Sequence, residues 1–211
     1  MQQQRRRFLQ MAMAAVFVPL ARAAEQGSEP VSKLLETPLP APSLHQGKHS
    51  VNDPKHDFDF FVGRWRIENQ RLRHRLQQSD DWEHFEASQE MRLLPGGIGN
   101  YDDFLAPSWR PGFVGMSLRL FNPQTQLWSI YWLDNTNAGL DSAGRLMPPV
   151  VGKFENGIGI FECADELDGK PIRVRYKWFD TDTETPRWEQ AMSADQGKTW
   201  EVNWRMKMFR Q

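Results

Sequence analysis

Apolar and polar side chains alternate with a period of two over most of the chain after residue 63, which is the spacing of half-buried antiparallel strands. The clearest segment runs from Trp200 to Met208 and reads Trp-Glu-Val-Asn-Trp-Arg-Met-Lys-Met, so that its apolar residues share one face. The same alternation occurs at 65–69, 128–133 and 172–178. The pattern predicts an all-β domain in which one face of each strand is buried.

Turn residues separate these segments. Asn156-Gly157 and Asp168-Gly169 are the strongest hairpin signals, because Asn-Gly and Asp-Gly adopt the positive φ angles that two-residue turns require. A short N-terminal helical turn is expected at 55–62, ending at Gly63. About ten strands are predicted, near 63–75, 82–93, 99–105, 113–121, 126–134, 147–154, 158–165, 171–179, 186–193 and 199–209.

The succession of short strands without a strong helix between them favours an antiparallel up-and-down barrel over a sheet built from β-α-β units. A β-sandwich is the alternative. The two architectures differ in closure, since a barrel has no edge strands and encloses an interior, whereas a sandwich has edges and a filled core.

Two glycine-containing motifs are interpreted as turns. Ser193 to Trp200 reads Ser-Ala-Asp-Gln-Gly-Lys-Thr-Trp, the Asp-box pattern that recurs in sialidase propellers, but a propeller needs several copies and this chain has one. We expect a hairpin in which Ser and Asp bind the turn backbone and Trp packs beneath. Pro95 to Gly99 lacks the Lys-Ser/Thr of a phosphate loop and is also expected to be a tight turn.

The N-terminus has the organisation of an export signal. Arg5 to Leu9 resembles the twin-arginine motif, an apolar run extends from Phe8 to Leu20, and Ala21-Arg22-Ala23 forms a small-x-small cleavage site. The sequence therefore predicts a signal peptide at 1–23, recognised by export machinery, and a periplasmic product; the Sec route stays open. The apolar run is too short to span a bilayer, so stable membrane insertion is not expected.

Residues 24–54 are rich in proline and lack a sustained apolar period, so they are predicted to be a linker that precedes a domain at 55–211. An alternative is that Leu34, Leu35 and Leu39 pack onto the domain as a strap. A further possibility is that this arm binds a protein partner.

Composition limits the function classes. The hydrophobic class makes up 39% of the chain, and counting the 15 glycines while leaving out the 3 tyrosines gives about 45% apolar residues. This is ordinary for a globular protein and excludes intrinsic disorder and collagen for the chain as a whole. The formal net charge of −1 argues against a general nucleic-acid binder. Cys163 is the only cysteine, so no intramolecular disulfide can form, and it is expected to be a small buried apolar residue.

Several motifs carry a family resemblance. Phe58 to Trp65 (Phe-Asp-Phe-Phe-Val-Gly-Arg-Trp) resembles the signature of a bacterial family of unknown function with lipocalin-like folds, as do Val151 to Gly159 and Arg187 to Ser193. The Gly-x-Trp of the first motif is similar to that of lipocalins, where the Trp closes one end of the barrel. The resemblance implies that Arg205 or Arg210 packs across this Trp. It also implies a calycin-type barrel with a cavity for a small, largely apolar molecule, and no settled activity.

The favoured hypothesis is a barrel that binds a small apolar or aromatic molecule without catalysis. Its candidate ligand-binding residues share the apolar face of their strands, with two amides as orienting groups: Trp65, Asn69, Trp132, Trp178, Gln190 and Trp204. A solid, filled core is the alternative. The competing hypothesis is a metal-assisted enzyme at the barrel mouth that uses His74, His84 or Asp102. No cofactor is assigned, and no catalytic residue is assigned under the favoured hypothesis.

Overall fold

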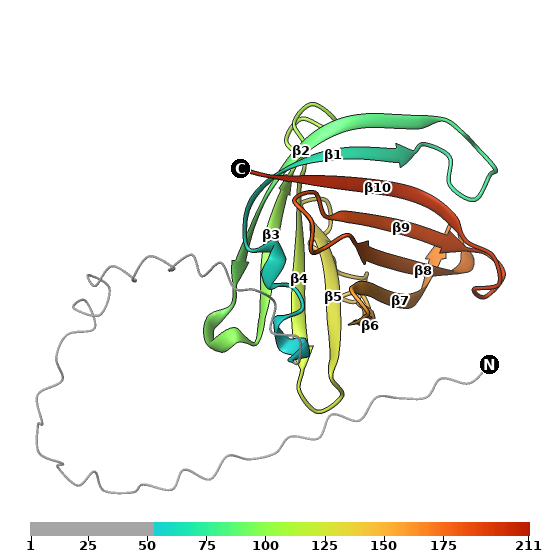
Figure 1. The fold of residues 1–211 in the computed structure, drawn as a ribbon. Helices are drawn as coiled ribbons and strands as arrows, with labels where there is room; N and C mark the ends of the chain where they lie inside the picture. The colour runs from blue at the N-terminus through green and yellow to red at the C-terminus, as the bar shows by residue number, and fades with distance from the viewer. Residues whose placement is uncertain (1–52) are drawn as a thin grey trace, which may run out of the picture. The chain divides into compact units, whose positions relative to one another are not determined.

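Each strand of the chain pairs with the strand that follows it, and the last strand pairs with the first, so the alternating segments form a closed antiparallel barrel (Figure 1). The computed structural model describes residues 53–211; the predicted signal peptide and nearly all of the predicted linker lie outside this range. The strands are β1 (Gly63–Leu72), β2 (Trp82–Leu93), β3 (Gly99–Leu105), β4 (Val114–Asn122), β5 (Leu127–Asp134), β6 (Val150–Glu155), β7 (Ile158–Leu167), β8 (Lys170–Phe179), β9 (Arg187–Ser193) and β10 (Glu201–Arg210). The predicted barrel is confirmed, and the sandwich is excluded by the pairing of β1 with β10.

The short hairpins form where the sequence predicts them. Asn156 and Gly157 have φ angles of 53° and 78°, and Asp168 and Gly169 have φ angles of 51° and 75°. Positive φ at both central residues is the geometry of a type I′ turn, whose twist matches that of the strands it joins. Within residues 53–211, no helix is long and apolar enough to cross a lipid bilayer.

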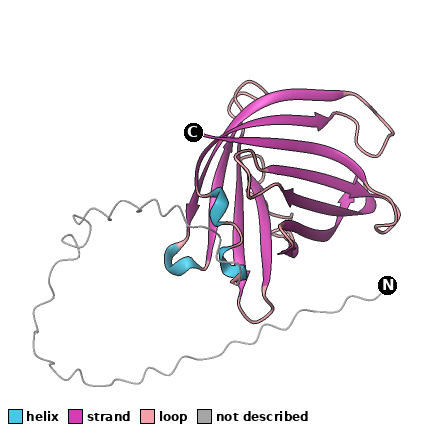
Figure 2. Cartoon of the chain, viewed as in Figure 1, coloured by secondary structure: helices cyan, strands magenta, loops and turns pink. Residues whose placement is uncertain are grey.

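The N-terminal helical region consists of two 3₁₀ turns, η2 (Pro54–His56) and η3 (Asp59–Phe61), rather than one continuous turn (Figure 2). Two indole N–H groups fix them to the barrel: Trp128 donates to the Pro54 carbonyl at 2.9 Å, and Trp65 donates to the Phe61 carbonyl at 2.8 Å. The turns thereby bring aromatic side chains into this end of the barrel, which we call the plugged end.

The plugged end is filled by interlocking rings. The Phe58 ring centroid lies 5.0 Å from that of Trp128, 5.1 Å from that of Phe154 and 5.7 Å from that of Trp178, each with edge-to-face geometry. Phe58 itself is 1% exposed. Edge-to-face contacts place positive ring edges on negative ring faces, which adds to the stabilisation from burial.

Arg210 closes the outside of the plugged end. Its guanidinium lies 4.1 Å from the Trp65 ring centroid and donates to the carbonyls of Val62 and Phe60 at 2.8 and 2.6 Å. Of the two arginines expected to cover Trp65, it is Arg210 that does so. Arg205 instead lies over another ring, Trp82, at 4.5 Å.

A β-bulge alters the face pattern of β10. The register against β9 shifts between Val202 and Trp204, so Asn203 is an extra residue on β10. A bulge reverses the alternation of side chains along its strand. The expectation that Trp200 and Val202 share the inner face with Trp204 is therefore wrong. Trp200 lies on the outer surface, where the Arg175 guanidinium is 3.8 Å from its ring centroid.

The Asp-box segment between β9 and β10 is the predicted hairpin turn. The Ser193 hydroxyl donates to Asp195 at 2.7 Å and accepts from the Gly197 N–H at 2.8 Å, while the Thr199 N–H donates to Asp195 at 2.9 Å. The Trp200 indole N–H donates to the Gly197 carbonyl at 3.0 Å. The polar atoms of the motif are thus engaged in hydrogen bonds within the turn. The hydrogen bonds that Asp195 accepts, first from Thr199 and then from Ser193, hold the pKa of its carboxyl group well below the ordinary value.

Candidate ligand-binding site

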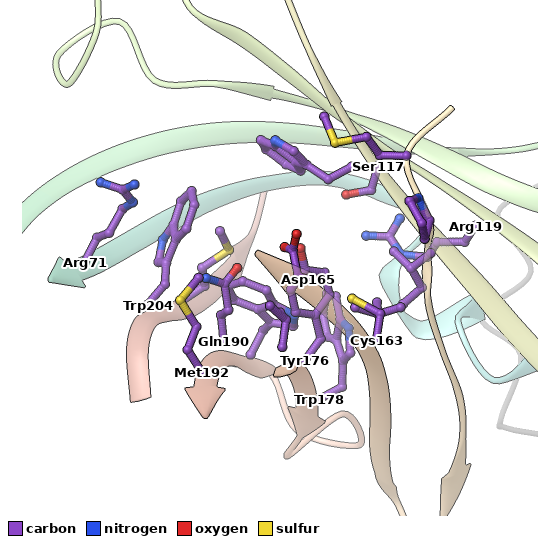
Figure 3. A pocket seen from close by; sticks show the side chains of 18 of the residues that line it. Arg71, Ser117, Arg119, Cys163, Asp165, Tyr176, Trp178, Gln190, Met192 and Trp204 are labelled. Atoms are coloured by element: carbon purple, nitrogen blue, oxygen red, sulfur yellow. The ribbon is translucent and has the colours of Figure 1, made fainter. Parts of the chain in front are cut away.

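Away from the plugged end, the barrel interior holds a cavity of about 360 Å³ (Figure 3). Its walls come mainly from β4, β5, β7, β8, β9 and β10, because the inward positions of these strands carry the lining side chains. Exposed residues of the β5–β6 connection and of β7, namely Met147, Pro148 and Asp165, also belong to the lining. We call this side, where the β1–β2 connection also contributes Arg75, the open end.

Aromatic rings form the walls of the cavity. Trp204 is central, since its ring centroid lies 6.0 Å from that of Trp188 and 6.4 Å from that of Trp132, both of which line the cavity with it. Tyr176 lines the same wall and contacts Trp188 edge to face at 5.0 Å. Such walls offer flat apolar surfaces to a ring or an alkyl chain.

Four of the six predicted site residues line this cavity: Trp132, Trp178, Gln190 and Trp204. Trp65 does not, because it is 2% exposed and stacked on Phe61 in the plugged end. Asn69 does not line the cavity either. Its Oδ1 accepts from the Trp204 indole N–H at 2.9 Å, so Asn69 orients the central ring of the wall.

Gln190 is oriented by the bulge of β10. Its Nε2 donates at 2.8 Å to Oδ1 of Asn203, the extra residue of the bulge, which is fully buried. The Gln190 Nε2 is thus engaged with Asn203. The side-chain oxygen of Gln190, Oε1, accepts no hydrogen bond from residues 53–211. Gln190 can therefore offer an acceptor to a ligand from within an aromatic wall.

A buried polar group forms the floor between the cavity and the plugged end. Arg119 and Asp102 are 2% and 0% exposed and form an ion pair at 2.5 Å. Asp102 also accepts from Gln89 Nε2 at 3.1 Å. The Arg119 guanidinium lies 5.2 Å from the Phe58 ring centroid and 5.7 Å from that of Trp178. A buried charge needs such a partner, because desolvation of an isolated ion is very unfavourable.

Sequence reasoning missed Arg119, because the inward face of β4 is its more polar face. Its inward positions include Ser117 and Arg119, while the apolar Met116 and Leu118 point outward and are half-buried. The signal available in the sequence was that Arg119 and Asp102, on neighbouring strands, carry opposite charges. A buried charge is tolerated when an opposite charge lies beside it.

The residues of the alternative enzyme site are not brought together. Asp102 is fully buried beside Arg119, whereas His74 and His84 are exposed on the β1–β2 connection and on β2. In the part of the chain that the structure describes, no group of three His, Cys, Asp or Glu residues could hold a metal ion. Adjacent Asp102 and Asp103 face opposite ways, and Asp103 accepts from the Glu90 N–H at 2.8 Å.

Two weakly acidic groups line the cavity. Burial raises the pKa of the half-buried Cys163 thiol to about 11, and the charge of Asp165 adds to this effect. Burial also raises the pKa of Tyr176 well above its ordinary value. Both groups keep their protons at neutral pH, so they offer apolar contact and hydrogen-bond donors rather than nucleophiles.

No protein-family model matches this chain, and no curated protein is significantly similar to it. The closed barrel and its aromatic cavity are therefore the observations on which a function can be proposed.

Proposed function

We propose that this chain is an exported, lipocalin-like barrel protein that binds a small, largely apolar or aromatic molecule in its cavity without catalysing a reaction on it. The observation that carries the proposal is the aromatic cavity of about 360 Å³. Small-molecule sites typically measure roughly 300–1,000 Å³ and combine apolar walls with a few oriented polar groups. Gln190 and Arg119 are two of the polar groups that line this site.

The cavity volume limits the size of the ligand. The volume of about 360 Å³ lies near the lower end of the range for small-molecule sites. That volume suits a two-ring aromatic compound or a medium-length alkyl chain. A molecule of this kind would replace water against Trp132, Trp188 and Trp204, and release of that water favours binding.

Tryptophan fluorescence and native mass spectrometry test the binding proposal. Protein purified from its own compartment is expected to carry a small apolar molecule, and titration of the emptied protein with aromatic compounds is expected to change its fluorescence. Trp204→Phe should remove most of this response. Trp200→Phe is the matched control on the same strand, because Trp200 lies outside the barrel. If no molecule co-purifies and no titration alters the fluorescence, the proposal is wrong.

The export part of the proposal is supported by the signal-like segment at 1–23, and family membership by the Phe58 to Trp65 motif. We propose that twin-arginine machinery delivers the chain to the periplasm. Arg5→Lys combined with Arg6→Lys should leave the precursor in the cytoplasm, and Arg22→Lys is the control outside the motif. Normal export of the double variant contradicts the twin-arginine route, and native protein that stays in the cytoplasm contradicts export.

A further inference from the structure

Arginine side chains gather at the open end of the barrel. Arg71 at the end of β1 and Arg75 in the connection that follows both line the cavity. The Arg71 guanidinium lies 5.3 Å from the Trp204 ring centroid and 5.2 Å from that of Trp109, and the Arg110 guanidinium lies 4.2 Å from the same Trp109 ring. Figure 3 shows Arg71 beside Trp204 at one end of the cavity. A ligand in the cavity therefore ends next to guanidinium groups.

These cations have too few carboxylate partners. Arg71 Nη1 pairs with Glu83 at 3.0 Å, but Glu83 also pairs with Arg73 at 3.3 Å. Among residues 53–211, no carboxylate oxygen lies within 4.0 Å of the side-chain nitrogens of Arg75 or Arg110. Arg73 also pairs with Asp81 at 3.4 Å, whereas within the described residues Arg71 has only the carboxylate of Glu83, which it shares.

The arginines also repel one another. Burial lowers the pKa of Arg71, and the neighbouring charges of Arg75 and Arg110 lower it further, against the opposing effect of Glu83. Like charges held close together at a partly buried site destabilise each other. An anion placed between Arg71 and Arg75 would relieve this repulsion and would gain charge-assisted hydrogen bonds.

The connection that carries Arg75 is anchored rather than loose. The Leu76 N–H donates to a carboxylate oxygen of Glu201 on β10 at 2.5 Å, and the Leu76 side chain packs against the barrel core. This anchor holds Arg75 at the edge of the cavity. A cation that is already in place loses less conformational freedom when it binds a ligand.

The carboxylate that lines the cavity lies elsewhere in the barrel. Asp165 is on β7, and the strands β10, β9 and β8 separate β7 from β1 in the sheet order. The cavity thus has a cationic side at Arg71 and Arg75 and an acidic group on another part of its lining, with aromatic rings between them.

We infer that the bound molecule is an apolar or aromatic carboxylate, with its charged group between Arg71 and Arg75 and its apolar body against Trp188 and Trp204. This inference rests on the proposed binding function and specifies the ligand class. A guanidinium group suits a carboxylate because its planar array of N–H donors matches the two carboxylate oxygens.

Calorimetric titration with three probes of one ring system tests the inference. Naphthylacetate, naphthylacetamide and naphthylethylamine share their ring but differ in charge. The acid should bind about tenfold more tightly than the amide, and the amine should bind most weakly. Raising the salt concentration should reduce the advantage of the acid, because exposed charges are screened.

Arg75→Gln should abolish the advantage of the acid, because the acid loses far more affinity than the amide does. Arg73→Gln is the matched control, because Arg73 is 53% exposed and lies outside the cavity lining; it should retain the advantage. Circular dichroism checks that both variants fold. Equal affinity for acid and amide, or an advantage that survives R75Q, overturns the carboxylate assignment while the binding function stands. If none of the three probes binds, the carboxylate assignment fails, and the binding function is decided separately by co-purification and fluorescence.

Discussion

The two ends of this barrel use tryptophan in different ways. At the plugged end, Trp65 and Trp128 donate to backbone carbonyls of the N-terminal turns, and the turns insert Phe58 among the rings. At the open end, Trp204 donates to a side chain of the barrel wall, Asn69, and its ring faces a cavity. At both ends, aromatic side chains of the strands point into the barrel. Among the described residues, a further segment, the N-terminal turns, fills the space between these rings only at the plugged end.

The boundary between the two ends is polar. Arg119 touches the plugged-end rings on one side and lines the cavity on the other, with Asp102 as its counter-ion. An aliphatic residue at this position would extend the apolar core into the cavity. A buried ion pair instead ends the core at a defined depth, because its polar atoms require each other's hydrogen bonds.

The largest effect is expected from a pair of variants, one in the filled plugged end and one on the cavity wall. Phe58→Ala should lower the free energy of unfolding by about 4 kcal/mol, because a fully surrounded ring is lost and a new cavity remains. Met192→Ala on the cavity wall should cost only about 2 kcal/mol, since one side of Met192 already faces open space. Urea denaturation of both variants measures this difference. Equal losses would show that the two ends are packed alike.

The fold was largely predictable from sequence, for a local reason. A period of two together with Asn-Gly and Asp-Gly turns specifies strands and hairpins within a few residues of chain, as at Asn156 and Asp168. The absence of any strong helix argued against β-α-β units, but closure depended on the pairing of β1 with β10, which no local pattern specifies. The bulge at Asn203 left no such local signature, and it reversed the predicted facing of Trp200.

The site was less predictable, because its character depends on contacts between distant segments. Asn69 meets Trp204 across 135 positions of sequence, so its role as the partner of a ring could not be distinguished from that of a ligand contact. Whether Trp65 faced a cavity or a filled core depended on where Phe61 came to lie. Inward polarity on β4 ran against the rule that apolar faces point inward, and for that reason Arg119 was missed.

The second-largest effect is expected at the Arg119–Asp102 ion pair, which separates the plugged end from the cavity. Asp102→Asn should lower the free energy of unfolding by about 3 kcal/mol, because Arg119 keeps its charge in a buried site without a counter-ion. Adding Arg119→Met should recover most of this loss. Asp103→Asn is the control, since that side chain faces outward and an amide oxygen still accepts from Glu90; it should cost less than about 0.5 kcal/mol. A loss for D103N as large as that for D102N would contradict the role of the ion pair.

The smallest effect is a gain at the plugged end. The pKa of Asp57, between the two helical turns, is raised from 3.8 to about 6, first by burial and then by the charge of Asp53. The folded chain therefore binds this proton more tightly than the unfolded chain, so stability falls as pH rises from about 4 to about 6 and stays reduced above that window. Asp57→Asn removes the penalty while retaining an acceptor oxygen for the Phe154 N–H.

Because Asp57 is only partly buried, solvent screens the effect and we expect a rise in unfolding temperature of about 2 °C at about pH 8. Near pH 4 the native carboxyl group is protonated in the folded state, and the variant should show no advantage there. Asp80→Asn, in an exposed connection at the open end, should leave the unfolding temperature nearly unchanged at both pH values. A gain from D57N of the same size at both pH values would mean that the carboxylate charge is not what strains the plugged end.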